Sequence, residues 1–248
     1  MLKTRNIIML LDTETVATRG NAQTVHDIGY LVYNKKTAEI LTSKRFLISE
    51  LHIDNVDYLD KSPFYTTKKR LYDADKTNFN YNALMPYRYA IIEMLEDMKA
   101  YKVTTVSAYN LDFDINALIS TCKAYAETLT DRLTSKLNKL AHIDLYRLAC
   151  YSILRTQTYI NYALQYNLAS HSGKNIGSGA ECCYRYINNN PDYIEQHTAL
   201  ADVYDELEIL KYLITNLHKR DILDNQIYGI DNQAWKKVTA FARELAMA

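Results

Sequence analysis

The sequence predicts an α/β protein in which a mixed sheet is flanked by helices. Apolar runs of strand length alternate with amphipathic helical stretches over most of the 248 residues. Hydrophobic residues make up 48% of the chain, and there are only 6 Gly and 3 Pro, so a large core is expected and no disordered linker is signalled. No segment repeats, which excludes a solenoid.

The expected elements follow from this pattern in chain order. The first is the run from Asn6 to Leu11, which has the length and composition of a buried strand. We expect strands near residues 6–11, 25–33, 40–48 and 103–108. We expect helices near residues 87–100, 114–128, 144–154, 159–168, 179–189 and 198–217, the last with a buried stripe at Leu200, Val203, Leu207 and Leu210.

These elements indicate one domain over residues 1–220. A polar stretch at about 51–85 interrupts it between the third strand and the next helix. For residues 221–248 the sequence predicts an amphipathic helical tail around Trp235 and Phe241, which we expect to pack on the domain, with partner binding as the alternative.

Four carboxylates and one histidine lie in contexts that would hold them against a divalent metal. Asp12 and Glu14 close the first strand, and strand geometry places residues i and i+2 on the same face. Asp114 lies near the start of a helix, where unpaired amides and the dipole favour a carboxylate. Asp202 lies beside the stripe of the last helix, and His197 is just over one turn upstream, close enough to share its cleft.

Each segment alone has a simpler explanation. A D-x-E pair is common by chance, an Asn-Phe-Asp cluster usually caps a helix, and a lone His at a helix start is more often a capping residue than a base. The three together, in this order, resemble the DEDDh branch of the 3′–5′ exonucleases, the DnaQ-like group of the RNase H-like superfamily. The matching segments are residues 12–15, 108–114 and 197–202, with further likeness at 27–32 and 142–149 and, most like phage-encoded members, at 178–197.

This resemblance implies an RNase H-like sheet and two bound Mg²⁺ or Mn²⁺ ions. Asp12 would bridge both ions, Glu14 and Asp202 would favour the ion that activates water, and Asp114 would help the other. His197 would take the proton of the attacking water. The sequence has no paired Cys/His cluster, which argues against zinc.

The resemblance also implies substrate contacts from the motif residues Thr13, Thr15, Asn110 and Phe113. Val16-Ala17 follows Thr15, where the family often has Thr-Gly, a departure that concerns the terminal-nucleotide pocket rather than the metal site.

A basic-aromatic cluster lies within the stretch 51–85. It contains Lys68, Lys69 and Arg70, which could hold the substrate strand, and three aromatic rings that could stack on bases, namely Phe64, Tyr65 and Tyr72. The alternative is a surface loop with an ordinary solvated charge run.

The expected activity is a 3′–5′ exonuclease that releases nucleoside 5′-monophosphates from single-stranded ends, with DNA as the favoured polymer. The alternatives are an exoribonuclease of the same family and a non-enzymatic subunit that docks a nucleic acid or a polymerase. A role in DNA replication would need a polymerase in trans. The net charge of zero suits an enzyme that grips a few nucleotides.

No apolar stretch approaches a membrane span, and no signal peptide is evident. We therefore expect no membrane partner and a cytoplasmic location, in the host cytoplasm if the protein is phage-encoded.

Overall fold

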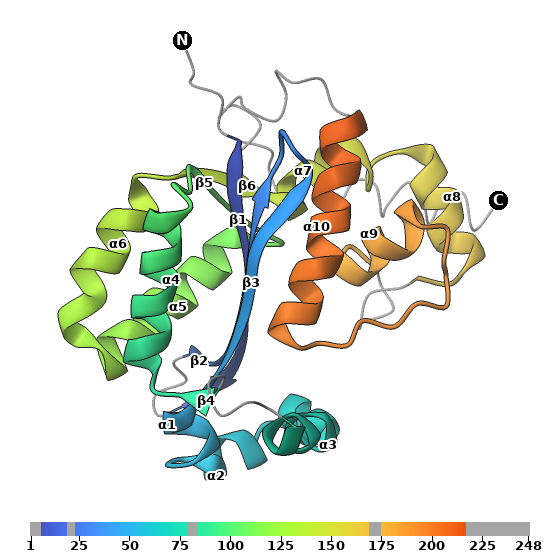
Figure 1. The fold of residues 1–248 in the computed structure, drawn as a ribbon. Coiled ribbons are helices and arrows are strands. Elements are labelled where there is room, and N and C mark those ends of the chain that lie inside the picture. The colour runs from blue at the N-terminus through green and yellow to red at the C-terminus, as the bar shows by residue number, and fades with distance from the viewer. Residues whose placement is uncertain (1–5, 19–22, 79–83, 169–174, 217–248) are drawn as a thin grey trace. The chain divides into compact units, whose positions relative to one another are not determined.

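The computed structural model describes residues 6–18, 23–78, 84–168 and 175–216 (Figure 1). It contains a six-stranded mixed sheet in the order β4-β3-β2-β1-β5-β6. The strands are β1 (Ile7–Ala17), β2 (Gln23–Asn34), β3 (Glu39–Ile48), β4 (Leu84–Met85), β5 (Thr105–Ala108) and β6 (Ala141–Asp144). β2 is antiparallel to β1 and β3, whereas β5 is parallel to β1 and β4 is parallel to β3. The predicted α/β class with a mixed sheet is confirmed.

The helices confirm most of the predicted positions. They are α1 (Ser49–His52), α2 (Val56–Asp60), α3 (Pro63–Asn78), α4 (Tyr87–Ala100), α5 (Leu111–Tyr125), the 3-10 turn η3 (Glu127–Leu129), α6 (Thr130–Asn138), α7 (Leu145–Ser152), α8 (Gln157–Gln165), α9 (Ala180–Ile187) and α10 (Ala199–Asn216). The short elements β4, β6, η3 and α6 were not predicted. Among the described helices, none is both long enough and apolar enough to cross a bilayer.

The chain divides into two compact units. The first contains residues 1–107, 112–142 and 197–203, and so holds most of the sheet, helices α1–α6 and the first turn of α10. The second contains residues 108–111, 143–196 and 204 onward, with α7, α8, α9 and most of α10. Residues 221–248, with the predicted helical tail, lie outside the described residues, and the single domain over 1–220 stays a prediction.

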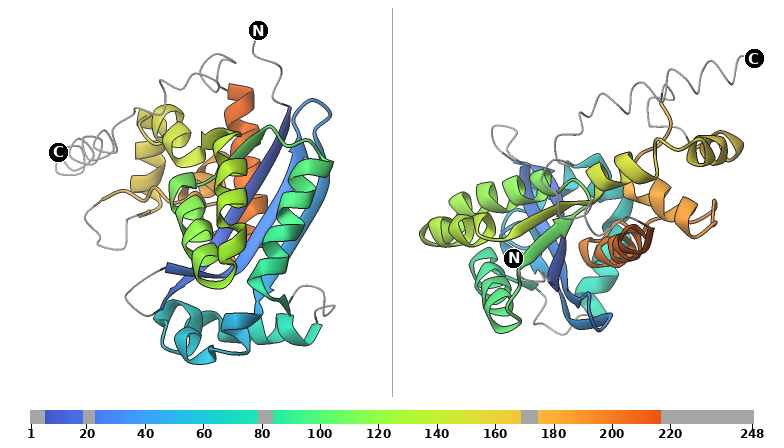
Figure 2. Two further views of the ribbon diagram at one scale, coloured as in Figure 1. Left: turned by 90° about the vertical axis from the view of Figure 1, so that its left-hand side faces the viewer. Right: turned by 90° about the horizontal axis from the view of Figure 1, so that it is seen from above.

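Both faces of the sheet in the first unit are covered near the middle of β2. The hydroxyl of Tyr30 donates to Asp97 of α4 at 2.8 Å. The neighbouring Gly29 faces the other way, toward the backbone of Ala199 at the start of α10. Figure 2 shows α4, α5 and α6 together on one face of the sheet. The first turn of α10 therefore lies on the opposite face from α4.

Strand β1 is longer than the predicted strand at 6–11. Its pairing with β2 continues to the partners Ala17 and Gln23. Asp12 and Glu14 therefore lie inside the strand and do not close it. Both side chains are half-buried there.

The inserted segment is helical and has its own small core. Val16, Leu47, Leu51, Leu59, Tyr65 and Tyr72 form this core. Tyr65 and Tyr72 are 1% exposed, and their rings stack with centroids 5.2 Å apart. These two rings hold the inserted helices on the sheet, so they are not exposed for stacking on bases. The alternative of a solvated loop does not describe residues 49–78 either, because most of them are helical.

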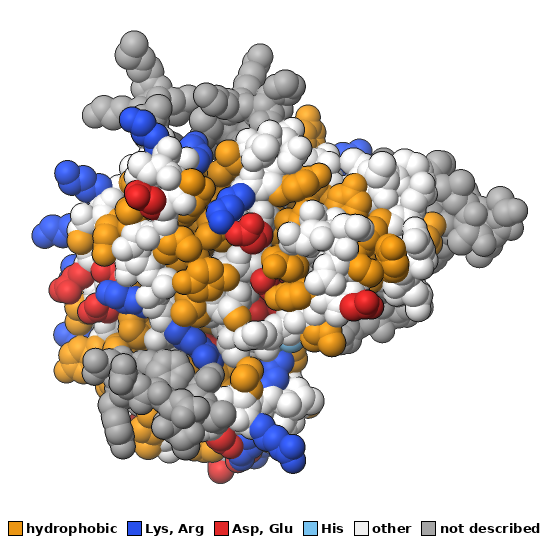
Figure 3. Space-filling model, turned by 45° about the vertical axis from the view of Figure 1, so that its right-hand side comes forward, with side chains coloured by type: hydrophobic (Ala, Val, Ile, Leu, Met, Phe, Trp, Pro, Cys, Tyr) orange, Lys and Arg blue, Asp and Glu red, His pale blue; other side chains and the backbone are white. Residues whose placement is uncertain are grey.

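Charged side chains of both signs are interspersed on the face shown in Figure 3. This distribution agrees with the balance of 29 basic and 29 acidic residues in the sequence.

Candidate metal centre

Strand β1 presents two carboxylates to one face of the sheet. In its register with β2, Asp12 lies opposite Gly29 and Glu14 lies opposite Asp27. The register shifts between Glu14 and Thr15, directly after the second carboxylate. Irregularities of this kind re-aim side chains and often occur beside active sites.

Gly29 allows the start of α10 to approach this face. A Cβ at Gly29 would lie 2.2 Å from the carbonyl carbon of Ala199 and 2.3 Å from the amide nitrogen of Leu200. Backbone atoms cannot move aside as a flexible side chain can, so only glycine fits. The segment from His197 to Asp202 is thereby held against β2, the strand whose Gly29 pairs with Asp12.

Glu14, His197 and Asp202 form a group that could hold a metal ion. Each offers one ligand atom, and these atoms all lie within 4.8 Å of one another. The amide of His197 donates to Asp202 Oδ1 at 3.0 Å, and the amide of Asp202 donates to the carbonyl of Thr198 at 3.0 Å. The helix start thus fixes His197 and Asp202 relative to each other.

His197 has a left-handed backbone, with φ of 56°. This conformation is uncommon for a residue other than glycine and costs on the order of 1–3 kcal/mol. The bond to Asp202 and the packing of the helix start hold the residue there. Strain of this kind concentrates at functional sites, and at this position it belongs to the residue predicted to act as a base.

Asp114 is fixed to the same stretch of β1 by Thr13. It lies in the first turn of α5 and is 2% exposed. Its Oδ1 accepts hydrogen bonds from the Thr13 amide at 3.0 Å and from the Thr13 hydroxyl at 2.8 Å. Thr13 lies between Asp12 and Glu14 in the chain, so Asp114 is bonded to the stretch of β1 that carries these two acids. Within the described residues, Asp12 and Asp114 are not part of the group of three mutually close ligand atoms.

The electrostatics of Glu14 suit a cation. Burial raises its pKa from 4.5 to about 7, and the Asp27 carboxylate adds to this effect, whereas Lys68 and Arg45 oppose it. A carboxylate whose charge is this costly is stabilised by a bound divalent cation. Carboxylate oxygens such as those of Glu14 and Asp202 are ligands that hard divalent cations prefer.

Asp27 of β2 lies opposite Glu14 and bonds to residues of the surrounding elements. No role for it was predicted from the sequence. It is fully buried and accepts hydrogen bonds from Arg45 Nη2 at 2.8 Å, the Tyr72 hydroxyl at 3.2 Å and the Ala199 amide at 3.3 Å. Burial raises its pKa, although Arg45 acts against that shift. One carboxylate therefore joins β2, β3, α3 and the start of α10. The sequence signal that could have indicated this role is the position of Asp27 directly before Ile28-Gly29.

Helix α3 places an aromatic ring and a cation beside the base. The ring of Phe64 contacts the ring of His197 edge-on, with centroids 5.6 Å apart. Lys68 Nζ lies 3.2 Å from the centroid of the Phe64 ring, and Lys68 also acts on the charge of Glu14. Lys69 instead pairs with Asp60 at 2.7 Å, and Arg70 is exposed. Of the three predicted basic contacts, Lys68 is the one that the structure brings to the metal centre.

The other predicted substrate contacts are more dispersed. Thr15 is half-buried and its hydroxyl donates to Gln23 Oε1 at 3.0 Å. Phe113 is 42% exposed in the first turn of α5. Asn110 belongs to the second unit and has a left-handed backbone with φ of 75°, which asparagine tolerates.

Comparison with solved structures places this arrangement in a known fold. A 3′-exonuclease solved in a study of "3′-end specific recognition of histone mRNA stem-loop" has a TM-score of 0.51 and 12% identity, over 86% of this chain and 84% of that chain. The nuclease domain of 3′hExo, described as a DEDDh family member bound to rAMP, has the same TM-score and identity over 86% of this chain and 94% of that one. The chain has the fold of the DEDDh exonucleases.

At this identity the likeness concerns the fold. No protein-family model matches the sequence, and comparison with curated proteins finds no match. The likeness to the solved structures confirms the predicted RNase H-like architecture.

Proposed function

We propose that this protein is a metal-dependent 3′–5′ exonuclease that acts on single-stranded nucleic acid. The observation that carries the proposal is the juxtaposition of Glu14, His197 and Asp202, with ligand atoms within 4.8 Å of one another. Asp12 on the same face of β1 and Asp114 bound to Thr13 complete the set of acids. The DEDDh exonuclease fold supports the same reading.

The four acids Asp12, Glu14, Asp114 and Asp202 would hold two Mg²⁺ or Mn²⁺ ions. When bound, such ions supply a nucleophilic hydroxide near neutral pH and stabilise charge on the leaving oxygen. His197 would accept the proton of the attacking water, and its fixed backbone keeps the imidazole beside Glu14 and Asp202. Cleavage at the 3′ end then releases nucleoside 5′-monophosphates.

The side chains proposed to contact the substrate come from several elements. Phe64 contacts His197, and Lys68 lies over the Phe64 ring. The Lys68 ammonium suits a phosphate, and the Phe64 ring suits stacking on a base. The remaining proposed contacts are Thr13, Thr15, Asn110, Phe113, Lys69 and Arg70.

DNA is the favoured polymer, and RNA is the second candidate. The RNA candidate has one specific support, because a solved protein of the same fold is described as recognising the 3′ end of a histone mRNA stem-loop. Action in DNA replication beside a polymerase in trans, a phage source and a cytoplasmic location rest on the sequence alone. A docking subunit without activity is the non-enzymatic alternative.

Digestion of end-labelled single strands tests this proposal. DNA and RNA oligonucleotides labelled at the 5′ end should shorten stepwise in Mg²⁺ or Mn²⁺, and 3′-labelled ones should lose their label at once. EDTA, Asp12→Ala and His197→Ala should each stop the reaction or slow it by at least about a hundredfold. Cleavage that persists in EDTA, or that starts at the 5′ end, would exclude the proposed activity, and the faster polymer decides between DNA and RNA.

A further inference from the structure

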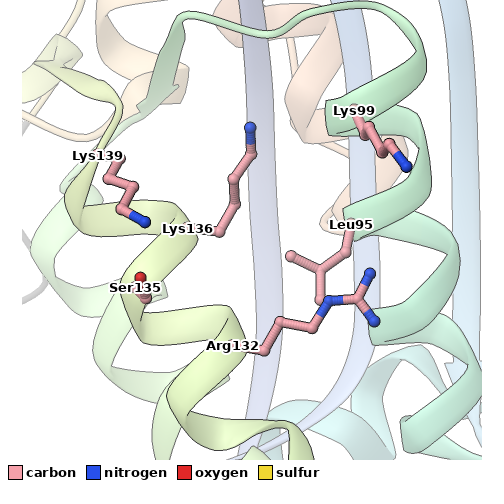
Figure 4. Close-up of a pocket in the computed structure, with 6 residues that line it drawn as sticks. All are labelled: Leu95, Lys99, Arg132, Ser135, Lys136 and Lys139. Atoms are coloured by element: carbon pink, nitrogen blue, oxygen red, sulfur yellow. The ribbon is translucent and has the colours of Figure 1, made fainter.

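A basic pocket lies between α4 and α6, on the face of the sheet opposite the metal centre. It has a volume of about 320 Å³ and is lined by Leu95, Lys99, Arg132, Ser135, Lys136 and Lys139 (Figure 4). Four of the six lining side chains are cationic, and none is acidic. A local excess of this size is notable in a chain whose net charge is zero.

The four cations are available to a ligand. Within the part of the chain that the structure describes, Lys99, Arg132, Lys136 and Lys139 form no ion pair with a carboxylate. Two acids of α4 are instead engaged elsewhere, because Lys44 of β3 pairs with Glu93 at 2.6 Å and with Asp97 at 2.8 Å. The acids nearest in sequence to the pocket residues, Glu96 and Asp131, do not line it.

The helix geometry gathers these charges on one side of α6. Leu133 and Leu137 are fully buried and fix the inner face of the helix. Arg132, Lys136 and Lys139 follow at spacings of four and three residues, so they share the face that looks onto α4.

The helix dipoles explain only part of this arrangement. Lys99, Lys136 and Lys139 lie at the C-terminal ends of α4 and α6, where cations are favoured. Arg132 lies in the first turn of α6, where the dipole disfavours a cation. Arg132 is exposed and forms no ion pair with a carboxylate within the described residues, so its guanidinium is open to an anion.

We propose that this pocket is a second nucleic-acid contact that binds phosphate groups of the substrate strand away from its 3′ end. The inference rests on the proposed exonuclease function, because that function supplies the polyanion. The guanidinium and the three ammonium groups carry positive charge and only donate hydrogen bonds, and the Ser135 hydroxyl can donate as well. This set suits phosphate oxygens and gives no base readout. Such a contact would hold a long strand while its end is shortened.

Binding of a 5′-labelled oligothymidylate in EDTA tests the pocket without cleavage. The variant Arg132→Gln/Lys136→Gln removes two cations with little change in helix propensity. Lys36→Gln/Lys123→Gln is the matched control, since both lysines are exposed and neither lines the pocket. For a single strand, loss of two phosphate contacts should reduce the slope of log affinity against log salt by about 1.4 and weaken binding at low salt. The control should bind as the wild type does.

Equal affinities and salt slopes for the two double variants, with both folded by thermal melting, would overturn the proposal. Binding of inorganic phosphate to the pocket, measured by calorimetry and lost in Arg132→Gln/Lys136→Gln while strand binding is unchanged, would also overturn it in favour of a free-phosphate site.

Hydrolysis of thymidine 5′-monophosphate p-nitrophenyl ester separates this inference from the proposed function. The pocket variant should hydrolyse this small ester at the wild-type rate, because the ester occupies only the metal centre. The same variant should show a raised KM on a long strand. An inert wild type would reject the exonuclease, and the binding measurement in EDTA would still decide the pocket.

Discussion

Glu14 is the residue at which folding and metal binding oppose each other. Its pKa of about 7 in the folded protein, against an ordinary 4.5, means that the metal-free fold retains a proton that the unfolded chain has lost. Stability of the metal-free protein should therefore fall as the pH rises from about 4.5 through 7. A bound divalent cation should reverse this effect, because it stabilises the carboxylate.

Glu14→Gln should make this visible. In EDTA at pH 8 the variant should be more stable than the wild type by roughly 3 kcal/mol, and the difference should vanish near pH 4. Denaturant unfolding across this pH range measures it. A variant that is less stable than the wild type at pH 8 would show that the buried carboxylate does not destabilise the metal-free fold.

Helix α3 brings Phe64 against His197 and Lys68 over Phe64, two contacts that the sequence motifs do not specify. Lys68 lies over Phe64 and acts on Glu14, whereas its neighbour Lys69 is paired with Asp60 at the surface. Lys68→Gln should therefore raise KM on single strands by on the order of tenfold, through loss of a charge-assisted contact. Lys69→Gln, one residue away on the same helix, should have little effect. Equal effects of the two substitutions on KM would place the substrate along the outer face of α3.

The start of α10 approaches β2 closely at Gly29. Gly29→Ala would force its Cβ against backbone atoms of Ala199 and Leu200, at 2.2 and 2.3 Å. We expect a loss of several kcal/mol in stability and a loss of metal affinity, because Asp202 moves with the helix start. Gly179→Ala is the matched control, since no atom lies within 4 Å of the added Cβ. Wild-type melting and metal binding in Gly29→Ala would contradict the close packing.

Much of the site could be predicted because its residues lie in strong local patterns. Asp12 and Glu14 follow the apolar first half of β1, and Asp114 lies in the first turn of an amphipathic helix. The helical insertion was harder to predict, because Tyr65 and Tyr72 are buried in a core that includes Val16 and Leu47, two residues distant in sequence. Tyrosine composition does not distinguish a core ring from a stacking platform.

The hydrogen bonds of Asp27 could not be predicted for a related reason. Asp27 acts through Arg45, Tyr72 and Ala199, three partners from three different elements. No local periodicity encodes such a contact. The basic pocket is similar, since Lys99 and Arg132 become neighbours only when α4 and α6 pack together.

The sheet carries carboxylates on one face, and a cationic pocket lies on the other face. The first feature is suited to cleavage at a strand end, and the second to holding the same strand. Because the chain has no net charge, both depend on where charges lie rather than on how many there are.

Calorimetric titration of Mn²⁺ into the protein tests the central claim, that these residues form a divalent metal centre. We predict saturable binding to the wild type, strongly weakened in Asp202→Asn and in Asp12→Ala. Glu208→Gln on α10 is a control that should bind normally, since Glu208 pairs with Lys211 at 2.7 Å. Unchanged Mn²⁺ affinity in Asp202→Asn and Asp12→Ala, with both variants folded, would contradict the account.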